Sequence, residues 1–259
     1  MLDTFGFPTP QGANYQAFYG GGTIRDWVKP RGASMVRMLL IGAGAGGTAS
    51  AGGGGTGGSS GAVTQWIGPA IFIPDVLRVS IGTGGGSSNI AGTNTEIIYQ
   101  SKDGTGYTLL TANGGSGNTG APASANNYFG AAGIYKSTAG HNGALAATSI
   151  IASTTVFLSG GAGGSDTATG VGGNVACNYG YPTILGGVGT TGGTGGSGIF
   201  ITQPIMLSAG GAGGGGSNTA GGKGGNGGIG CGGGGGGRGS GSVGAGGRGG
   251  DGAAFFWSW

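Results

Sequence analysis

The sequence is poor in charged residues and in the residue types that usually carry chemistry. Only 7% of its 259 residues are Asp, Glu, Lys or Arg, whereas an average soluble domain has roughly 25%. Seven carboxylates, one histidine and two cysteines leave little material for acid–base catalysis or for a metal site. We therefore expect a protein that is not an enzyme and that binds no cofactor and no metal. Cys177 and Cys231 are either buried thiols or a disulfide.

Runs of basic residues and long apolar stretches are also missing. The ten Lys and Arg residues are scattered, and no stripe of them could follow a phosphate backbone, so we expect no nucleic-acid partner. No segment approaches the roughly 20 apolar residues of a membrane span, so we expect no membrane insertion. Residues 1–8 contain no basic segment followed by an apolar one, which argues against a secretory signal peptide.

Glycine is what the chain has in abundance, with 76 residues. These glycines occur in blocks, and the chain has only 8 prolines, so it lacks the strict Gly-X-Y period and the proline content of collagen. The mean hydropathy is +0.10 and the net charge is +3. Both values differ from those of a disordered chain that is kept open by low hydrophobicity and high net charge.

Short apolar runs alternate with the glycine tracts along the chain. The runs are rich in β-branched or aromatic residues and are bounded by glycine, which favours strands over helices. Asp103 and Gly104 predict a hairpin turn between Tyr99 and Tyr107. Glycine costs a helix about 1 kcal/mol per residue relative to alanine, so we predict an all-β or irregular fold with almost no α-helix. The apolar runs are residues 35–41, 71–81, 107–112, 150–158, 199–207 and 253–259.

The longest glycine tract, residues 210–252, has a period of three in two places. The positions separated there by Gly-Gly are Lys223, Asn226 and Ile229, and then Ala245, Arg248 and Asp251. A polyproline-II-type helix has three residues per turn and no internal hydrogen bonds, so packed copies can bond to one another where glycine permits close approach. We predict a short β-strand framework with packed polyglycine-II helices, in which residues 232–237 have neighbours on all sides. Disordered tracts and an ordinary β-sheet with glycine-rich turns are the alternatives.

The first 30 residues differ from the rest of the chain. They are dense in aromatic residues and are too few to form their own core, so they are expected to pack on the main body or on a partner protein. We predict an attachment segment at residues 1–30 and a glycine-rich domain of β-structure and polyglycine-II helices at residues 31–259. The predicted docking residues are Phe5, Phe7, Tyr15 and Trp27.

Residues 27–47 combine Trp27, a Pro-Arg-Gly turn, an apolar run and a glycine block. This order resembles the start of the glycine-rich domains of bacteriophage tail-fibre and other virion proteins. Residues 73–82 and 249–256 are similar to the second and last strands of that family, so the resemblance covers about residues 27–259. The overall plan also resembles the polyglycine-II tip adhesins of T-even-type long tail fibres, although the N-terminus does not match their attachment sequence.

The resemblance implies a virion protein, assembled in the host cytoplasm, that acts as a receptor-binding adhesin at the tip of a fibre or spike. Its partners would be other virion proteins, such as a trimeric shaft, and a bacterial outer-surface protein or glycan. One alternative is a structural decoration of the capsid or tail that binds no receptor. A second is an ice-binding protein, since some antifreeze proteins are also bundles of polyglycine helices.

A receptor-binding tip needs aromatic and amide side chains on loops that a stiff base holds in place. Such side chains combine apolar area with hydrogen-bonding groups at a low entropic cost. For each of them, packing over the β framework is the alternative role. The candidate receptor-binding residues are Asn127, Tyr128, Phe129, Tyr135, Tyr179 and Tyr181.

Overall fold

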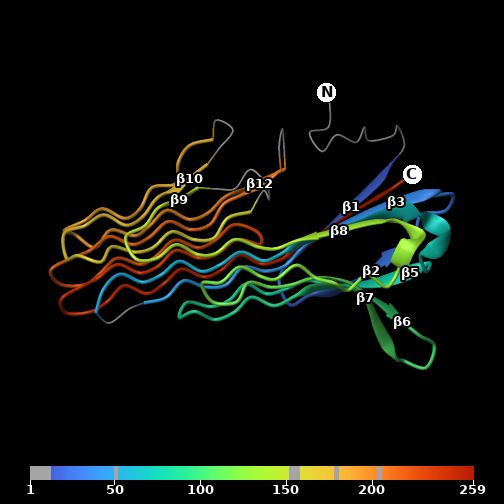
Figure 1. Ribbon diagram of the computed structural model, residues 1–259, viewed down its shortest axis with the longest axis horizontal. Coiled ribbons are helices and arrows are strands. Elements are labelled where there is room, and N and C mark those ends of the chain that lie inside the picture. The colour runs from blue at the N-terminus through green and yellow to red at the C-terminus, as the bar shows by residue number, and fades with distance from the viewer. Residues whose placement is uncertain (1–12, 50–51, 152–157, 178–180, 203–205) are drawn as a thin grey trace.

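The computed structural model describes residues 13–49, 52–151, 158–177, 181–202 and 206–259, and it divides into two parts (Figure 1). At one end the strands form a sandwich of two sheets, and at the other end long, wavy, extended segments form a bundle. Among the described residues there is no α-helix, and only two short 3-10 helices occur, η1 (Ala70–Phe72) and η2 (Gly130–Ala132). The predicted all-β or irregular fold is therefore confirmed.

Two antiparallel sheets make the sandwich, and two pairs of very short strands lie outside it. The first sheet has the order β1 (Asn14–Tyr19), β13 (Ala253–Ser258), β3 (Met35–Ile41), β4 (Val63–Pro69) and β8 (Ile134–Thr138). The second sheet has the order β2 (Ile24–Val28), β5 (Val76–Ser80), β6 (Thr95–Gln100) and β7 (Gly106–Ala112). The short pairs are β9 (Ile150–Ile151) with β10 (Val175–Ala176), and β11 (Phe200–Ile201) with β12 (Leu207–Ser208).

The hairpin predicted at Asp103 and Gly104 is confirmed. It joins β6 to β7, and Tyr99 lies opposite Tyr107 in the ladder. Gly104 has a φ of 86°, a left-handed conformation that glycine adopts without the steric penalty of a side chain. The Asp103 carboxylate accepts a hydrogen bond of 2.9 Å from the amide of Thr105, which closes the turn.

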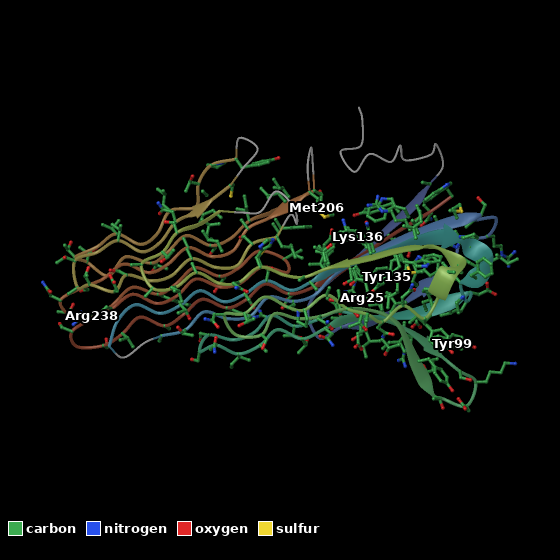
Figure 2. The ribbon with its side chains drawn as sticks, in the orientation of Figure 1. Arg25, Tyr99, Tyr135, Lys136, Met206 and Arg238 are labelled. Atoms are coloured by element: carbon green, nitrogen blue, oxygen red, sulfur yellow. The ribbon has the colours of Figure 1, made fainter. Side chains whose placement is uncertain are left out.

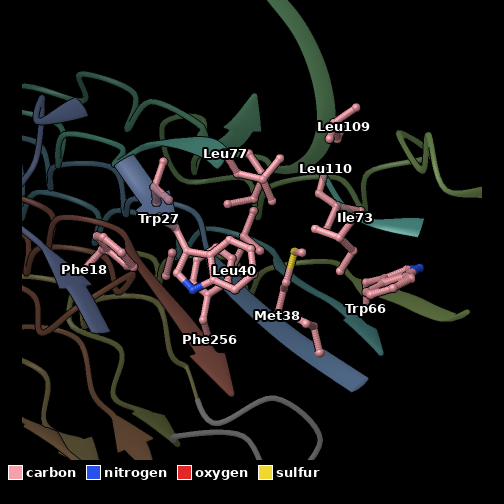
Figure 3. Packing of buried hydrophobic residues seen from close by; sticks show 14 of the residues in the cluster. Phe18, Trp27, Met38, Leu40, Trp66, Ile73, Leu77, Leu109, Leu110 and Phe256 are labelled. Atoms are coloured by element: carbon pink, nitrogen blue, oxygen red, sulfur yellow. The ribbon is translucent and has the colours of Figure 1, made fainter. Parts of the chain in front are cut away.

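The main hydrophobic core fills the space between the two sheets (Figure 3). Trp27 from β2 stacks on Phe256 from β13, with ring centroids 4.9 Å apart and planes 20° from parallel. Met38 and Leu40 from β3 and Trp66 from β4 complete the centre of the core. Aromatic side chains from both sheets therefore hold the sandwich together.

Strand β3 is buried on both faces, which explains its continuous apolar sequence. Alternate residues of a strand point to opposite faces, so Met38 and Leu40 lie in the sandwich core while Leu39 and Ile41 face the other way. The second face belongs to a separate cluster that also contains residues from the start of later glycine tracts. The further buried members of this second cluster include Leu158, Met206, Cys231 and Phe255.

Residues 13–30 belong to the sandwich and do not form a separate body. Strand β1 pairs with β13 along its whole length, and β2 pairs with β5. The boundary expected after residue 30 is therefore not a structural division among the described residues. The physical reason is that strands β13 and β5 each offer a row of backbone hydrogen-bonding groups, which the N-terminal strands satisfy.

The bundle is a lattice of extended segments, and residues 232–237 lie at its centre. The amides of this central segment donate hydrogen bonds of 2.8–3.2 Å to three neighbouring segments, and residues three apart donate to the same segment. The pairs are Gly232 to Ser159 and Gly235 to Ala162, Gly233 to Ala45 and Gly236 to Thr48, and Gly234 to Gly225 and Gly237 to Gly222. Its carbonyls accept bonds of 2.7–3.0 Å from three further segments, through Gly211, Gly58, Gly247, Gly214, Gly55 and Gly244. Because six surrounding segments satisfy the central one, the predicted polyglycine-II packing is confirmed.

Close approach in this lattice requires glycine at the inward positions. A Cβ atom placed on any residue from 232 to 237 would come within 3.0 Å of backbone atoms of a neighbouring segment. The period-three residues of the outer segments behave differently, because Lys223, Asn226, Ala245 and Arg248 are all exposed. The sequence pattern therefore separates inward from outward positions.

The two similar junctions of the chain, near residues 158 and 207, lead into neighbouring segments of the bundle. The amide of Ala162 donates to the carbonyl of Gly211, and that of Ser165 donates to Gly214, each over 2.9 Å. Both segments therefore run in the same direction side by side. Leu158 and Leu207 are buried at their bases, so the two similar junctions begin equivalent, parallel segments of the bundle.

Both described cysteines are free thiols, and they are expected to differ in reactivity. Cys231 is fully buried, and burial raises the pKa of its thiol to about 12; Cys177 is only partly buried, although burial raises its pKa as well. The thiolate is the reactive form. At a pH of about 8, iodoacetamide should therefore modify Cys177 well before Cys231. In the unfolded protein, the two thiols should be labelled at equal rates. Mass spectrometry of the labelled peptides measures this, and equal labelling of the folded protein would contradict it.

Candidate binding surfaces

Four turns meet at the end of the bundle that lies farthest from the sandwich (Figures 1 and 2). We call residues 165–171, 188–193, 216–221 and 238–243 the turn end. Backbone hydrogen bonds join these turns to one another, from Gly192 to Gly216, from Gly216 to Gly170, from Ser217 to Arg238 and from Arg238 to Ser165, over 2.8–3.0 Å. The turn end is therefore a continuous surface built on the lattice, and its loops do not hang free of one another.

The exposed side chains of the turn end are mostly small and polar. One cation and one carboxylate stand among them, and the Arg238 guanidinium donates to the backbone carbonyl of Asp166 over 3.3 Å. The exposed hydroxyl and amide groups of the turn end can donate hydrogen bonds to a partner and accept hydrogen bonds from it. The exposed residues include Asp166, Thr167, Thr169, Thr190, Asn218, Thr219, Arg238 and Ser240.

Thr190 gives one of these turns an unusual backbone conformation. Its φ is 67°, a left-handed value that costs a β-branched residue of order 1–3 kcal/mol. The Thr190 hydroxyl donates to the carbonyl of Gly189 over 2.6 Å, and the amide of Thr191 donates to the same carbonyl over 2.8 Å. These bonds fix the turn and leave the threonine exposed at its tip.

A second candidate surface is a pocket of about 420 Å³ on the sandwich. It lies at the β6–β7 hairpin, where Figure 2 places Tyr99, and the η1 and η2 segments form its other walls. Its walls are aromatic and apolar, and no charged side chain is among the described residues that line it. The lining residues are Phe72, Pro74, Tyr99, Tyr107, Leu109, Tyr128, Phe129 and Ala132.

Four of the predicted receptor-binding residues lie at or beside this pocket. Tyr128 is 68% exposed at its rim, and Phe129 packs on the buried Trp66 with ring centroids 4.7 Å apart. The Asn127 side-chain amide donates to the carbonyl of Gly130 over 3.2 Å and so fixes the turn that presents both rings. Tyr135 is partly buried behind them, and its hydroxyl donates to the carbonyl of Ser124.

Of the other predicted receptor-binding residues, Tyr181 does not line the pocket. It comes three residues before Ile184, which pairs with Val175, and Tyr179 lies outside the described residues. Among the predicted docking residues, Phe5 and Phe7 also lie outside the described residues.

The two other predicted docking residues occupy opposite environments. Tyr15 is 49% exposed on the outer face of the first sheet, where its ring lies 5.4 Å from that of Trp257. Partial burial and the neighbouring Tyr19 raise the pKa of the Tyr15 phenol, so it stays protonated. Trp27 is fully buried in the core, so in this fold its ring offers no surface to a docking partner.

The described residues of the two surfaces offer mainly hydroxyl groups, amide groups and aromatic rings. In the part of the chain that the structure describes, no three His, Cys, Asp or Glu side chains come together as metal ligands would, and no helix has the length and apolarity to cross a bilayer. Both surfaces are suited to binding through hydrogen bonds and ring contacts. No protein-family model matches the chain, and no curated protein is significantly similar to it.

Proposed function

We propose that the protein is a phage virion protein that acts as a receptor-binding adhesin at the tip of a fibre or spike. The observation that carries this proposal is that the chain ends and the turn end lie at opposite ends of the molecule. The ends of the described chain lie at the sandwich, whereas the turn end lies at the opposite end of the bundle. In the proposal, the sandwich faces the virion and the turn end touches the host cell surface.

The backbone contacts of the chain ends support this orientation. Asn14, the first residue of β1, lies opposite Ser258 in the ladder, and the carbonyl of Trp259 accepts hydrogen bonds from the amides of Ser34 and Met35 over 2.7 and 2.9 Å. Asn14 and Ser258 therefore both lie at the end of the sandwich that points away from the bundle. The docking role of residues 1–12, including Phe5 and Phe7, stays a prediction.

The bundle has the stiffness that a contact surface needs. Its central segment is bonded on all sides, so little conformational entropy remains to be lost when the turn end meets a partner. Preorganised loops on a rigid base bind more tightly than mobile loops with the same side chains. The turn end therefore suits recognition of a surface protein or glycan.

Substituting an exposed turn-end side chain should slow adsorption of the phage to its host. Asn218 is exposed, and its side chain makes no hydrogen bond to a described residue, so Asn218→Arg should change the surface without disturbing the lattice. We expect the adsorption rate of purified virions that carry Asn218→Arg together with Thr169→Arg to fall by about tenfold or more, as expected when a contact surface receives two bulky charges.

Ser197→Arg is the matched control, because Ser197 is exposed on the flank of the bundle and lies outside the turn end. Virions with this control should adsorb like the wild type. All variants must be incorporated in equal amounts, which quantitative mass spectrometry of virions checks. Normal adsorption of virions that lack the protein altogether would overturn the proposal that it is an adhesin. A structural decoration of the virion would then be the better explanation.

A further inference from the structure

The aromatic pocket combines apolar walls with hydrogen-bonding groups that have no partner. The hydroxyls of Tyr99, Tyr107 and Tyr128 make no hydrogen bond to any residue that the structure describes. Each phenol can donate one hydrogen bond and accept another. Phe72, Phe129 and the buried Leu109 also line the pocket. Such a pocket fits a ligand that has both apolar faces and several polar groups.

Backbone hydrogen bonds and a ring contact hold the loop that carries Tyr128 and Phe129 in place. The amide of Tyr128 donates to the carbonyl of Leu109 over 3.0 Å, which ties the loop to strand β7. The amide of Ala132 donates to the carbonyl of Phe129 over 3.0 Å, and the Phe129 ring rests on Trp66. Little ordering is therefore needed on binding, which favours affinity for a small ligand.

We propose that this pocket is a binding site for a neutral saccharide, a second contact that is separate from the turn end. The C–H faces of a pyranose ring can lie on the Tyr107 and Tyr128 rings, while its hydroxyls bond the phenols. No charged side chain lines the described wall to pair with a carboxylate or phosphate. The volume of about 420 Å³ lies within the range of small-molecule pockets. The role of this pocket in host recognition rests on the proposed function.

A proline-rich peptide is the other class of ligand that aromatic grooves commonly bind. The three unpartnered phenols favour a saccharide, because sugar hydroxyls both donate and accept and can satisfy both roles of each phenol. A proline residue has no amide N–H and offers only its carbonyl as an acceptor. A proline-rich peptide would therefore leave part of the hydrogen-bonding capacity of the pocket unused.

The position of the pocket gives the saccharide a distinct role. It lies on the sandwich, and the bundle separates it from the turn end (Figures 1 and 2). On a cell covered by polysaccharide, the outer part of the polysaccharide layer would contact the pocket on the sandwich, while the turn end reaches deeper, towards the cell surface. Capture of an outer glycan could then precede the contact made by the turn end.

The test uses the purified full-length protein on a printed array of oligosaccharides. One half of the array carries neutral di- to tetrasaccharides of glucose, galactose, mannose and rhamnose, and the other half carries chains of matched length that contain sialic or uronic acid. We expect binding to neutral chains, weakened about tenfold or more in Tyr107→Ala and in Tyr128→Ala. Tyr107→Phe and Tyr128→Phe keep the rings and should show intermediate losses. Tyr15→Ala, an exposed tyrosine outside the pocket, should bind like the wild type.

Three results would each overturn the saccharide site: no binding to any neutral chain, stronger binding to the acidic chains, or neutral binding that survives both alanine substitutions. A set of proline-rich peptides on the same array tests the competing ligand, and their capture by the pocket in place of neutral chains also ends the proposal. Circular dichroism confirms that each variant is folded. Because the array needs no virion, its outcome is independent of the adsorption experiment that tests the adhesin.

Discussion

Gly234→Ala is expected to lower the free energy of unfolding by about 3 kcal/mol or more, the upper part of the range for an overpacked interior. Gly234 lies in the central segment, where its amide donates to Gly225 over 2.8 Å and its carbonyl accepts from Gly247 over 2.7 Å. An added Cβ would meet the backbone of Ala212. Backbone atoms that are bonded on several sides cannot move aside as a flexible side chain can, so the lattice must open. Urea unfolding measures the loss.

The control is Gly52→Ala, at a glycine where a Cβ would meet nothing within 4 Å. The same chemical change there should leave stability unchanged or raise it by up to about 1 kcal/mol, because alanine restricts the unfolded chain. A Gly234→Ala protein as stable as the Gly52→Ala protein would show that the lattice is looser than its hydrogen bonds indicate. The pair therefore separates the effect of packing from that of the residue type.

Trp27→Ala is expected to cost about 3–5 kcal/mol of stability, as large aromatic truncations in cores do. The Trp27 ring is fully buried and stacks on Phe256 at 4.9 Å, between the two sheets. Its loss leaves a cavity where β2 and β13 meet. Urea unfolding of the purified variant measures the effect. Under the proposed virion role, incorporation into virions should fall in parallel because less folded protein is present.

Tyr15→Ala is the comparison, since Tyr15 is half exposed on the outer face of the same sandwich. Its loss should cost about 1 kcal/mol, an ordinary value for a partly buried substitution. If Trp27→Ala instead unfolded like the wild type yet failed to enter virions, the core role of Trp27 would be refuted and the docking role would return. The two variants thus distinguish a structural tryptophan from a contact tryptophan.

The sequence predicted the bundle better than the sandwich, for a physical reason. A helix with three residues per turn and no side chains on its inward faces carries a side chain at every third position. Lys223 and Asn226 show this spacing in the sequence. Strand pairing leaves no such local record. The runs 35–41 and 253–259 were predicted to be strands, but nothing in them shows that β13 lies between β1 and β3. Strand β4, which follows directly on a glycine tract, was not predicted at all.

The aromatic pocket was predicted only in part. Tyr128 and Phe129 were recognised as a cluster of rings and amides in a loop. The sequence predicts Tyr99 and Tyr107 only as the flanks of a hairpin. It includes Phe72 in an apolar run predicted to be a strand, whereas strand β5 begins four residues later, after η1. Its lining comes from segments up to 60 residues apart, and only the fold brings these together.

The turn end was missed because its residues are small and common. The signal that could have found it is the placement of clusters such as Ser-Asn-Thr at residues 217–219 and Arg-Gly-Ser at residues 238–240 between tracts of nearly pure glycine. A tract that ends in polar residues and then resumes has reversed its direction. Such breaks mark the places where the chain leaves the lattice and becomes accessible to a partner.

The bundle also sets a rule for how the chain can change its length. In a helix with three residues per turn, removing one residue from 232–237 would rotate everything after it by a third of a turn, and every amide beyond the deletion would face the wrong neighbour. Removing three residues would keep each face in place and only shorten the rod. Insertions and deletions inside the tracts are therefore tolerated in whole turns, while the loops between tracts are free to take any length.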